Sequence, residues 1–293
     1  MRTMLRHRAN RRDAPGLRDG DTRPLIHPIE PPPPRALPSI PPPRLRDRLR
    51  AAGIHLLLSA AVGAAVLAIV VFAWYPPPMH TLIGVGAILL IMLGVDVVIG
   101  PVFTLLVYDR RKRNLRWDLA TIAALQLLAL GYGVWTVHQG RPAFVVLVKD
   151  RFEVVSPAEL RPADRAAAQD NPHARAVPLS PRWVAAKMPD GPQERSDILF
   201  EALAQGRDVQ HHPKLYVALD AQSAVMLERA LPISRLRSLN PQSGRHIDAA
   251  VAATGRPEDA LSYLPLRGPA SDGAVLIGRS DARVLRVAAF APW

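Results

Sequence analysis

The sequence of 293 residues carries 37 Lys and Arg against 25 Asp and Glu, a formal net charge of +12, and contains no cysteine. Without cysteine the chain cannot form a disulfide scaffold, a cysteine-bound zinc or iron–sulfur site, or a cysteine nucleophile. Apolar residues make up 49 % of the chain and are segregated, with no Lys or Arg in residues 51–108 and no charge in 119–137, which excludes an ordinary soluble protein.

The first 44 residues differ in composition from the rest of the chain. Residues 1–44 contain 11 of the 30 prolines and show no apolar periodicity. This composition predicts a disordered, Pro- and Arg-rich tail that is locally extended where prolines cluster. Three interpretations stay open for it: a docking site for a partner, a plain solvated tail, and a start codon assigned upstream of the true one.

Residues 45–137 predict a membrane domain of three helices. The expected spans are residues 51–75, 81–108 and 117–137. Each has at least about 20 residues, which at 1.5 Å per residue is enough to cross a hydrocarbon core of roughly 30 Å. Strands do not explain runs of this length, because only a helix satisfies its own backbone within one segment in lipid.

The distribution of charge predicts how these spans are oriented. Residues 1–50 hold 12 basic and 5 acidic residues, residues 109–118 hold 5 and 2, and the link at 76–80 holds neither Lys nor Arg. Basic segments mark the cytoplasmic side, so we expect a cytoplasmic N-terminus and residues 138–293 on the far side. A nucleic-acid binder would instead spread basic residues over a folded face with aromatics interleaved, so we expect membrane lipid rather than nucleic acid as a partner.

The candidate site is a polar face inside the second span. Asp96, Gly100 and Thr104 follow one another at four-residue spacing and share a helix face, and Gln126 lies at a similar depth in the third span. A buried carboxylate is costly in a membrane unless it is paired, hydrated or protonated. We therefore expect Asp96 and Gln126 to meet inside the bundle, and Pro101 to kink the helix and free a backbone carbonyl. A structural contact, an ion or proton pathway and a site for a partner's helix are the open alternatives.

Other polar residues give weaker signals. His55 lies about one turn inside the first span and is expected to reach toward the interface. Small residues recur there at four-residue spacing and favour close helix contact; they are Ser59, Ala60, Gly63, Ala64 and Ala68. The chain lacks the motifs of phosphate-binding loops, zinc proteases and serine hydrolases. We therefore expect no catalytic, cofactor-binding or metal-binding residues and no enzyme activity.

Residues 138–293 predict a small α/β domain of about 150 residues, enough to bury one core. A Ser156–Glu159 capping pattern predicts a helix start, and Gly206 predicts a helix stop. The expected elements are a strand at 143–148, a helix at 194–205, a strand at 215–219, a helix at 221–230 and a hairpin of 274–278 with 284–290. The expected fold class is a three-helix membrane domain followed by a small α/β (α+β) domain outside the cytoplasm.

Several strings of the sequence resemble one known family, the type IV pilin accessory proteins of the TfpX/TfpZ kind. The similarity is dense over roughly residues 50–160 and thinner later, at Leu264-Pro265-Leu266 and Pro292-Trp293. Its strings are IHLLLS at 54–59, WYP at 74–76, GVDVVIGP at 94–101, LRWDL at 115–119, QLLALGYGV at 126–134, RPAFVV at 141–146 and DRFEVV at 150–155. The long tail departs from the usual pattern, in which little precedes the first span.

The resemblance implies a multi-pass protein of the bacterial inner membrane with a periplasmic domain. It implies a role as an accessory protein in fimbrial biogenesis, assisting assembly of a cognate type IV major pilin, with other pilus assembly proteins as further partners. It supplies no catalytic residues and no cofactor. An envelope sensor with an extracytoplasmic ligand-binding domain is the alternative, although residues 1–50 are short for a cytoplasmic output module.

Overall fold

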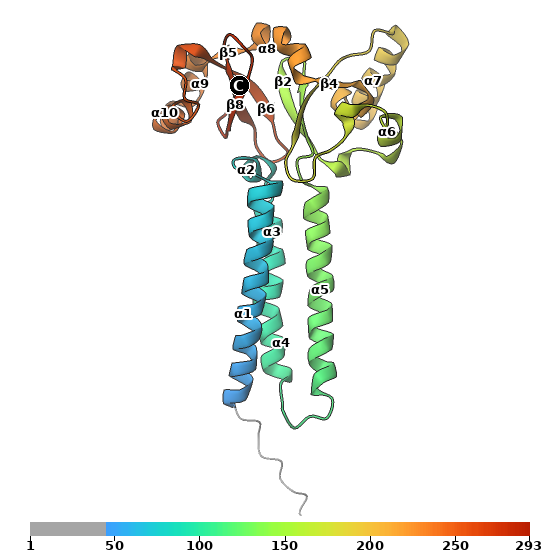
Figure 1. The fold of residues 1–293 in the computed structure, drawn as a ribbon, viewed down its shortest axis with the longest axis vertical. Coiled ribbons are helices and arrows are strands. Elements are labelled where there is room, and N and C mark those ends of the chain that lie inside the picture. Colours follow the sequence, from blue (N-terminus) through green and yellow to red (C-terminus); the bar gives the residue numbers. More distant parts are fainter. Residues whose placement is uncertain (1–44) are drawn as a thin grey trace, which may run out of the picture. The chain divides into compact units, whose positions relative to one another are not determined.

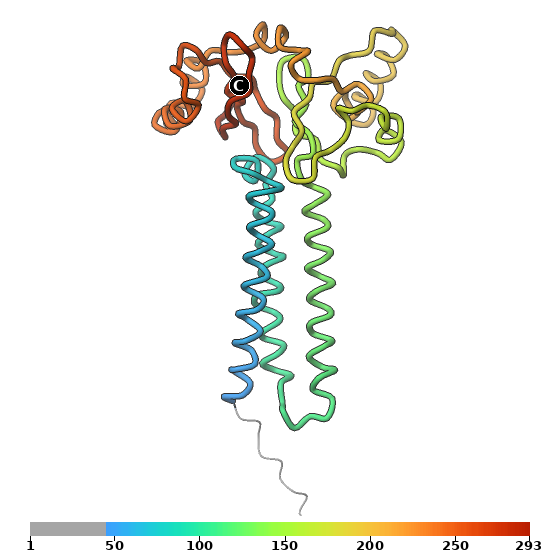
Figure 2. The backbone as a smooth tube through the Cα atoms, in the orientation of Figure 1, coloured from blue at the N-terminus to red at the C-terminus, as the bar shows by residue number. Residues whose placement is uncertain are grey.

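The computed structural model describes residues 45–293. The expectations for the tail at residues 1–44 lie outside this described part. Long helices form its first portion and a mixed sheet with surrounding helices forms its second (Figure 1), and the backbone trace in Figure 2 follows the same order.

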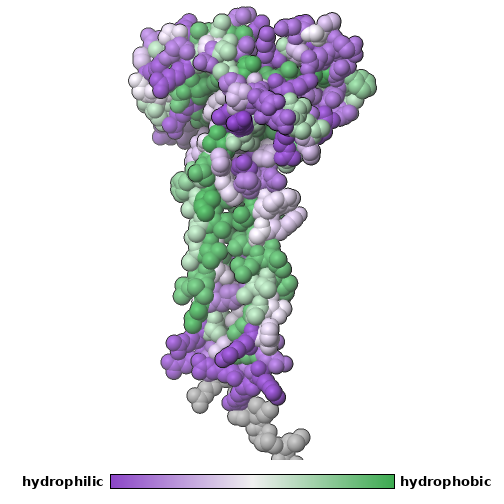
Figure 3. Space-filling model, turned by 45° about the vertical axis from the view of Figure 1, so that its right-hand side comes forward, coloured by the Kyte–Doolittle hydropathy of each residue, from purple (hydrophilic) through white to green (hydrophobic). Residues whose placement is uncertain are grey.

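Three long helices make up the first portion. The first combines α1 (Leu45–Ile69) with a π-helical turn at Val70–Trp74, and the third is α5 (Leu115–Gln139). The second combines α3 (Gly86–Gly94), a π-helical turn (Val95–Ile99) and α4 (Gly100–Val107). Within residues 45–293 these three helices are long and apolar enough to cross a membrane. Figure 3 shows apolar side chains along the surface of the three long helices. Hydrophilic side chains lie at the end of these helices that is away from the sheet domain.

The second long helix begins at Gly86, five residues later than the span expected from Thr81. Thr81 lies instead in a separate short helix, α2 (Met79–Ile83), which ends at Gly84 with a φ of +77°. Met79 and Leu82 of this helix are buried in the core of the sheet domain. Residues 81–83 therefore belong to a helix that packs in a protein core, whereas the sequence alone assigns them to the second membrane span.

Eight strands in the described part form one mixed sheet, which agrees with the expected α/β domain. The order is β4-β3-β1-β2-β6-β7-β8, and β5 pairs with β6. Strands β1 with β3 and β2 with β6 are parallel, and the other pairs are antiparallel. The strands are β1 (Phe144–Val148), β2 (Arg151–Val155), β3 (Arg182–Ala186), β4 (Tyr216–Ala218), β5 (Leu231–Pro232), β6 (Leu261–Arg267), β7 (Gly273–Gly278) and β8 (Val284–Ala288).

Short helices connect these strands. They are α6 (Pro162–Ala167), α7 (Pro192–Gln205), α8 (Ser223–Arg229), α9 (Ile233–Leu239) and α10 (Gly244–Ala252). Single 3₁₀ turns lie at Pro157–Glu159, Pro172–Ala174, Val209–His211, Pro213–Leu215, Leu219–Gln222, Pro241–Ser243 and Glu258–Ala260. The terminal hairpin and the stop of α7 at Gly206 are confirmed. The capping box at Ser156 forms, but it begins only the 3₁₀ turn at Pro157–Glu159.

The apolar side chains of α7 are only partly buried. Ile198 is 4 % exposed, whereas Leu199 is 59 % and Leu203 is 80 % exposed, and Phe200 between them is 69 % exposed. Ile198 is the buried side chain of this helix, and Glu194 and Glu201 form ion pairs with Lys214 and Arg161. The rest of its apolar surface faces outward.

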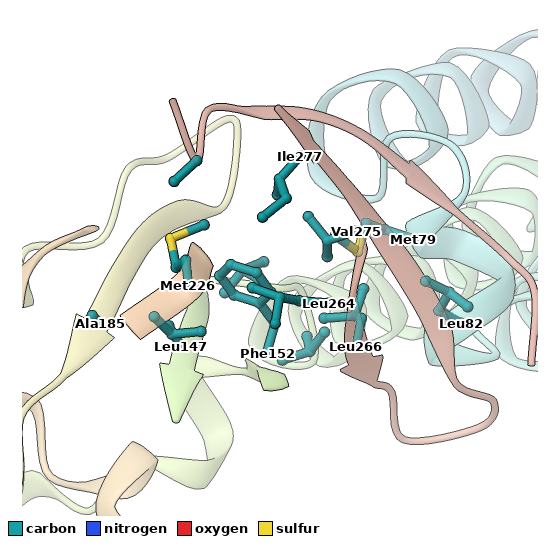
Figure 4. Packing of buried hydrophobic residues seen from close by; sticks show 13 residues of the cluster. Met79, Leu82, Leu147, Phe152, Ala185, Met226, Leu264, Leu266, Val275 and Ile277 are labelled. Atoms are coloured by element: carbon teal, nitrogen blue, oxygen red, sulfur yellow. The ribbon is translucent and has the colours of Figure 1, made fainter. Parts of the chain in front are cut away.

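The sheet domain has buried side chains on both of its faces. One cluster includes Phe152, Leu264 and Ile277 together with Met79 and Leu82 from α2. Figure 4 shows these side chains gathered between the strands and α2. The other clusters lie on the opposite side, one around β1 and β3 and one around α9 and α10. The core of the sheet domain therefore takes in part of the connection between the first two long helices.

Hydrogen bonds complete this connection. The carbonyl of Leu82 accepts from the backbone N–H groups of Ala270 at 3.0 Å and Ser271 at 3.1 Å. The hydroxyl of buried Tyr75, directly after the first long helix, donates to the carbonyl of Val137 near the end of α5 at 2.6 Å. The ends of the helices are thus fixed to each other and to the sheet domain.

Candidate functional site

A π-helical turn holds Asp96 midway along the second long helix. In a π turn a carbonyl accepts from the N–H five residues later, and for Asp96 that residue is Pro101, which has no N–H. The backbone carbonyl of Asp96 therefore needs a donor from elsewhere. The sequence predicts that Pro101 frees a carbonyl in this helix, and the π turn at Val95–Ile99 identifies the carbonyl as that of Asp96.

Gln126 of α5 supplies that donor. Its Nε2 donates to the Asp96 carbonyl at 3.1 Å. Gly100 makes this approach possible, because a Cβ atom built there would lie 2.6 Å from Cδ of Gln126. The expected meeting of Asp96 and Gln126 therefore occurs, and the Gln126 amide donates to the backbone carbonyl of Asp96.

Thr104, the third member of the predicted face, contacts His55. The His55 Nδ1 and Thr104 Oγ1 atoms lie 2.5 Å apart, which joins α1 to α4 by a side-chain hydrogen bond. Thr104 is buried and His55 half-buried. The imidazole thus has a partner inside the bundle, whereas the sequence predicts that it reaches toward the interface.

A cavity of about 290 Å³ opens beside these residues, and its polar lining consists of His55, Ser59, Asp96 and Gln126. The rest of the lining is apolar and comes from α1 and α5; it includes Leu58, Val62, Ala123, Leu127 and Leu130. Leu58 and Leu127 are 63 % and 67 % exposed, so the cavity is a groove that opens to the side of the bundle. We call it the bundle groove.

The bundle groove holds hydrogen-bond acceptors without donors. Asp96 is only 6 % exposed. Its Oδ1 and the Oε1 of Gln126 are both buried and have no hydrogen-bond partner. A buried acceptor without a donor costs about 1–3 kcal/mol, and more when it is charged. The groove is therefore suited to a ligand that brings a hydrogen-bond donor into an apolar surrounding.

Small residues elsewhere bring the helices into close contact. A Cβ atom at Gly63 would lie 2.9 Å from Leu93, and one at Gly133 would lie 2.7 Å from the sulfur of Met92. Gly63 is the buried member of the small-residue series in the first helix, while its neighbours Ala60 and Ala64 stay exposed. Only part of this small-residue series therefore makes close helix contacts within the chain.

The sequence pattern by itself does not predict the His55–Thr104 contact or the bundle groove. A signal for the contact exists, since His55 follows Arg50 by five residues and Thr104 precedes Asp109 by five. Antiparallel neighbouring spans place such residues at the same depth. The groove has no comparable signal, because it depends on how far α5 stands from α1.

Among the residues that the structure describes, no group of three or more His, Asp or Glu is placed to hold a metal ion. The chemistry that the bundle groove offers is hydrogen bonding and apolar contact.

Comparison with known proteins identifies the family of this chain. A family model described as fimbrial assembly protein FimB matches residues 43–84. A fimbrial assembly protein of serogroups C1 and C2 of Dichelobacter nodosus is 32 % identical over 110 residues, which is 37 % of this chain and 84 % of that protein. The chain belongs to the family of fimbrial assembly proteins.

A second relative extends the similarity along the chain. The fimbrial assembly protein of serogroup I of Dichelobacter nodosus is 28 % identical over 218 residues, covering 73 % of this chain and 84 % of that protein. No solved structure matches this chain. The segment matched by the family model includes His55, Gly63, Tyr75 and Leu82, which connect the first helix and α2 to the rest of the fold.

Proposed function

We propose that this protein is an inner-membrane accessory protein that assists, in a chaperone-like way, the assembly of a cognate type IV pilin. Its family membership supports a role in fimbrial assembly. The single observation that carries the finer proposal is the bundle groove, an apolar lateral groove with two buried acceptors that have no donor. The protein acts in this proposal by binding, without catalysis or a cofactor.

The resemblance to pilin accessory proteins implies a partner with an apolar helix in the same bilayer and a globular head outside it. Lipid tails cannot donate hydrogen bonds to Asp96 or Gln126, whereas a helix with a polar side chain at that depth can. The exposed apolar walls, such as Leu58 and Leu127, provide van der Waals contact along such a helix. The groove is therefore suited to hold a pilin helix transiently, before the pilin is assembled into the fimbria.

The exposed apolar side chains of α7 give a second surface. Leu199, Phe200 and Leu203 stand together on one helix of the sheet domain and are each at least 59 % exposed. Exposed apolar patches on a folded domain mark interaction surfaces. We assign this patch to contact with the head of the pilin, on the same side of the membrane as the sheet domain.

We further propose that the three long helices span the inner membrane, with the N-terminus cytoplasmic and the sheet domain periplasmic. The loop of residues 108–114 between the second and third helices carries Arg110, Arg111, Lys112 and Arg113, which supports a cytoplasmic position for this loop. Alkaline phosphatase fused after Trp293 should therefore be active in whole cells. Fusion after Arg113 should be inactive and serves as the control, and the opposite pattern would overturn the topology.

The proposed role of the bundle groove is tested by Asp96→Ala. The hydrogen bond from Gln126 goes to the backbone carbonyl of residue 96, which alanine retains, so the bundle keeps this link while the carboxylate is lost. We expect normal abundance of the protein in the membrane and a loss of surface fimbriae of about tenfold or more, since a charge-assisted hydrogen bond contributes about 1.5–3 kcal/mol.

Val98→Ala provides the matched control, because Val98 lies on the same helix and is 59 % exposed. Membrane abundance is measured by immunoblot and surface fimbriae by shearing and quantification. Normal abundance together with normal fimbriation would remove the groove from the function. Loss of both would show that Asp96 acts in folding instead.

A further inference from the structure

A second cavity, of about 410 Å³, lies where α5 meets the sheet domain. Its lining includes His138 and Gln139 at the end of α5, and three arginines, Arg141, Arg165 and Arg175. Its apolar lining comes from Ala143, Phe144, Leu160 and Ala168. We call this cavity the arginine pocket. Asp and Glu are absent from the described residues that line it.

Arg141 is the buried cation of this pocket. It is 8 % exposed. Its Nη1 donates to the carbonyl of His138 at 2.8 Å and lies 3.2 Å from Nδ1 of the same residue, and the ring of His138 packs edge-on against Trp74 with centroids 4.9 Å apart. The Nε of Arg141 is buried and has no hydrogen-bond partner. The guanidinium is thus oriented by neutral groups and retains an unused donor.

The surroundings of Arg141 differ from those of other arginines in the sheet domain. Arg207 is paired with Asp164, Arg237 with Glu258 and Arg256 with Asp281. No such pair occurs for Arg141 among residues 45–293, and burial lowers the pKa of its guanidinium. A buried charge without a counter-ion is costly, and exposed Arg165 and Arg175 add positive charge at the same cavity. The missing component is an anion.

The position of the pocket indicates where that anion comes from. His138 and Gln139 are the last residues of the third apolar helix, so the pocket lies at the level of lipid headgroups if this helix spans the membrane. Guanidinium groups match phosphate oxygens in pairs. Juxtamembrane basic residues each contribute about 1 kcal/mol to binding of anionic lipid.

We propose that the arginine pocket binds the phosphate of an anionic phospholipid headgroup, with Arg141, Arg165 and Arg175 as its ligands. The inference rests on the proposed membrane insertion, but it is independent of the proposed action on a pilin. The bound phosphate accepts from the guanidinium groups that line the pocket and neutralises their charge. The lipid then fixes the height of the sheet domain above the membrane.

The test uses the full chain purified in a non-ionic detergent and titrated with phosphatidylglycerol, phosphatidylcholine or inorganic phosphate, with bound lipid counted by native mass spectrometry. We expect phosphatidylglycerol to bind more tightly than phosphatidylcholine. Arg165→Gln and Arg175→Gln should each weaken the affinity for phosphatidylglycerol about fivefold. Both side chains are exposed, so these variants should keep the fold, which Arg141→Gln need not.

The matched controls are Arg245→Gln and Arg283→Gln, two exposed arginines of the same domain that do not line the pocket. Equal weakening in the control and pocket variants would reduce the effect to net charge and overturn the proposal. Equal binding of phosphatidylcholine, or binding of inorganic phosphate without any lipid, would overturn the assignment to an anionic lipid. Fimbriation is not part of this readout, so failure here leaves the proposed function standing.

Discussion

Replacing Leu82 with alanine is expected to lower the free energy of unfolding by about 2–5 kcal/mol, the usual cost of truncating a fully buried leucine. Leu82 is 0 % exposed and belongs to the core cluster of the sheet domain. A Cβ atom at Gly273 would lie 3.1 Å from its Cδ1, so the side chain packs directly on β7. Alanine keeps the carbonyl that accepts from Ala270 and Ser271, and the variant therefore isolates the packing of the side chain.

The measurement is urea unfolding of the full chain in detergent micelles, followed by tryptophan fluorescence. Limited proteolysis should also cut the connection around α2 faster, because this helix loses its anchor in the core. Leu90→Ala is the control, since Leu90 is 75 % exposed on α3. If both variants unfold at the same urea concentration, α2 does not contribute to the core as the structure indicates.

The same residue shows where sequence reasoning ends. The long apolar helices could be predicted because hydropathy over about 20 residues is a local property. The apolar pair Leu82 and Ile83 fits a membrane span and a protein core equally well. Its place is decided by strands β6 and β7, which follow far along the chain. The local sequence pattern contains no information about packing partners that lie so far along the chain.

The sheet domain gives a second example. The strand at Phe144–Val148 and the terminal hairpin could be predicted, because each is an apolar run with its turn close by. Strand β6 could not be predicted from its local pattern, even though it pairs with β2, β5 and β7. It contains Pro265, which argues against a strand in the middle of a sheet. Here the surrounding strands outweigh the local preference.

In the candidate site, too, the local sequence predicts one part of the arrangement and tertiary contacts decide the rest. The similar level of Asp96 and Gln126 along their helices could be predicted from helical rise alone, and the structure brings the two residues together. The accepting atom could not be predicted, because it depends on the π turn at Val95–Ile99 and on the missing N–H of Pro101. The Asp96 Oδ1 atom keeps no hydrogen-bond partner, and this unused acceptor is what favours the proposed binding role over a purely structural contact.

Gly100→Ala is expected to destabilise the bundle by about 1–3 kcal/mol, the cost of leaving a buried polar group without its partner. The new Cβ would lie 2.6 Å from Cδ of Gln126, so the flexible Gln126 side chain must move away. The Asp96 carbonyl then loses its donor. Gln126→Ala removes the same hydrogen bond by another route, and for this reason the two substitutions together should cost clearly less than their sum.

Gly94→Ala is the matched control for this double-mutant cycle. Gly94 lies on the same long helix, and a Cβ atom there would meet nothing within 4 Å, so this variant reports only the higher helix propensity of alanine, up to about 1 kcal/mol. Stability is measured by urea unfolding in micelles for all four variants. Strict additivity of Gly100→Ala and Gln126→Ala would mean that they act on separate contacts, and the arrangement in which Gly100 admits Gln126 to the Asp96 carbonyl would then be wrong.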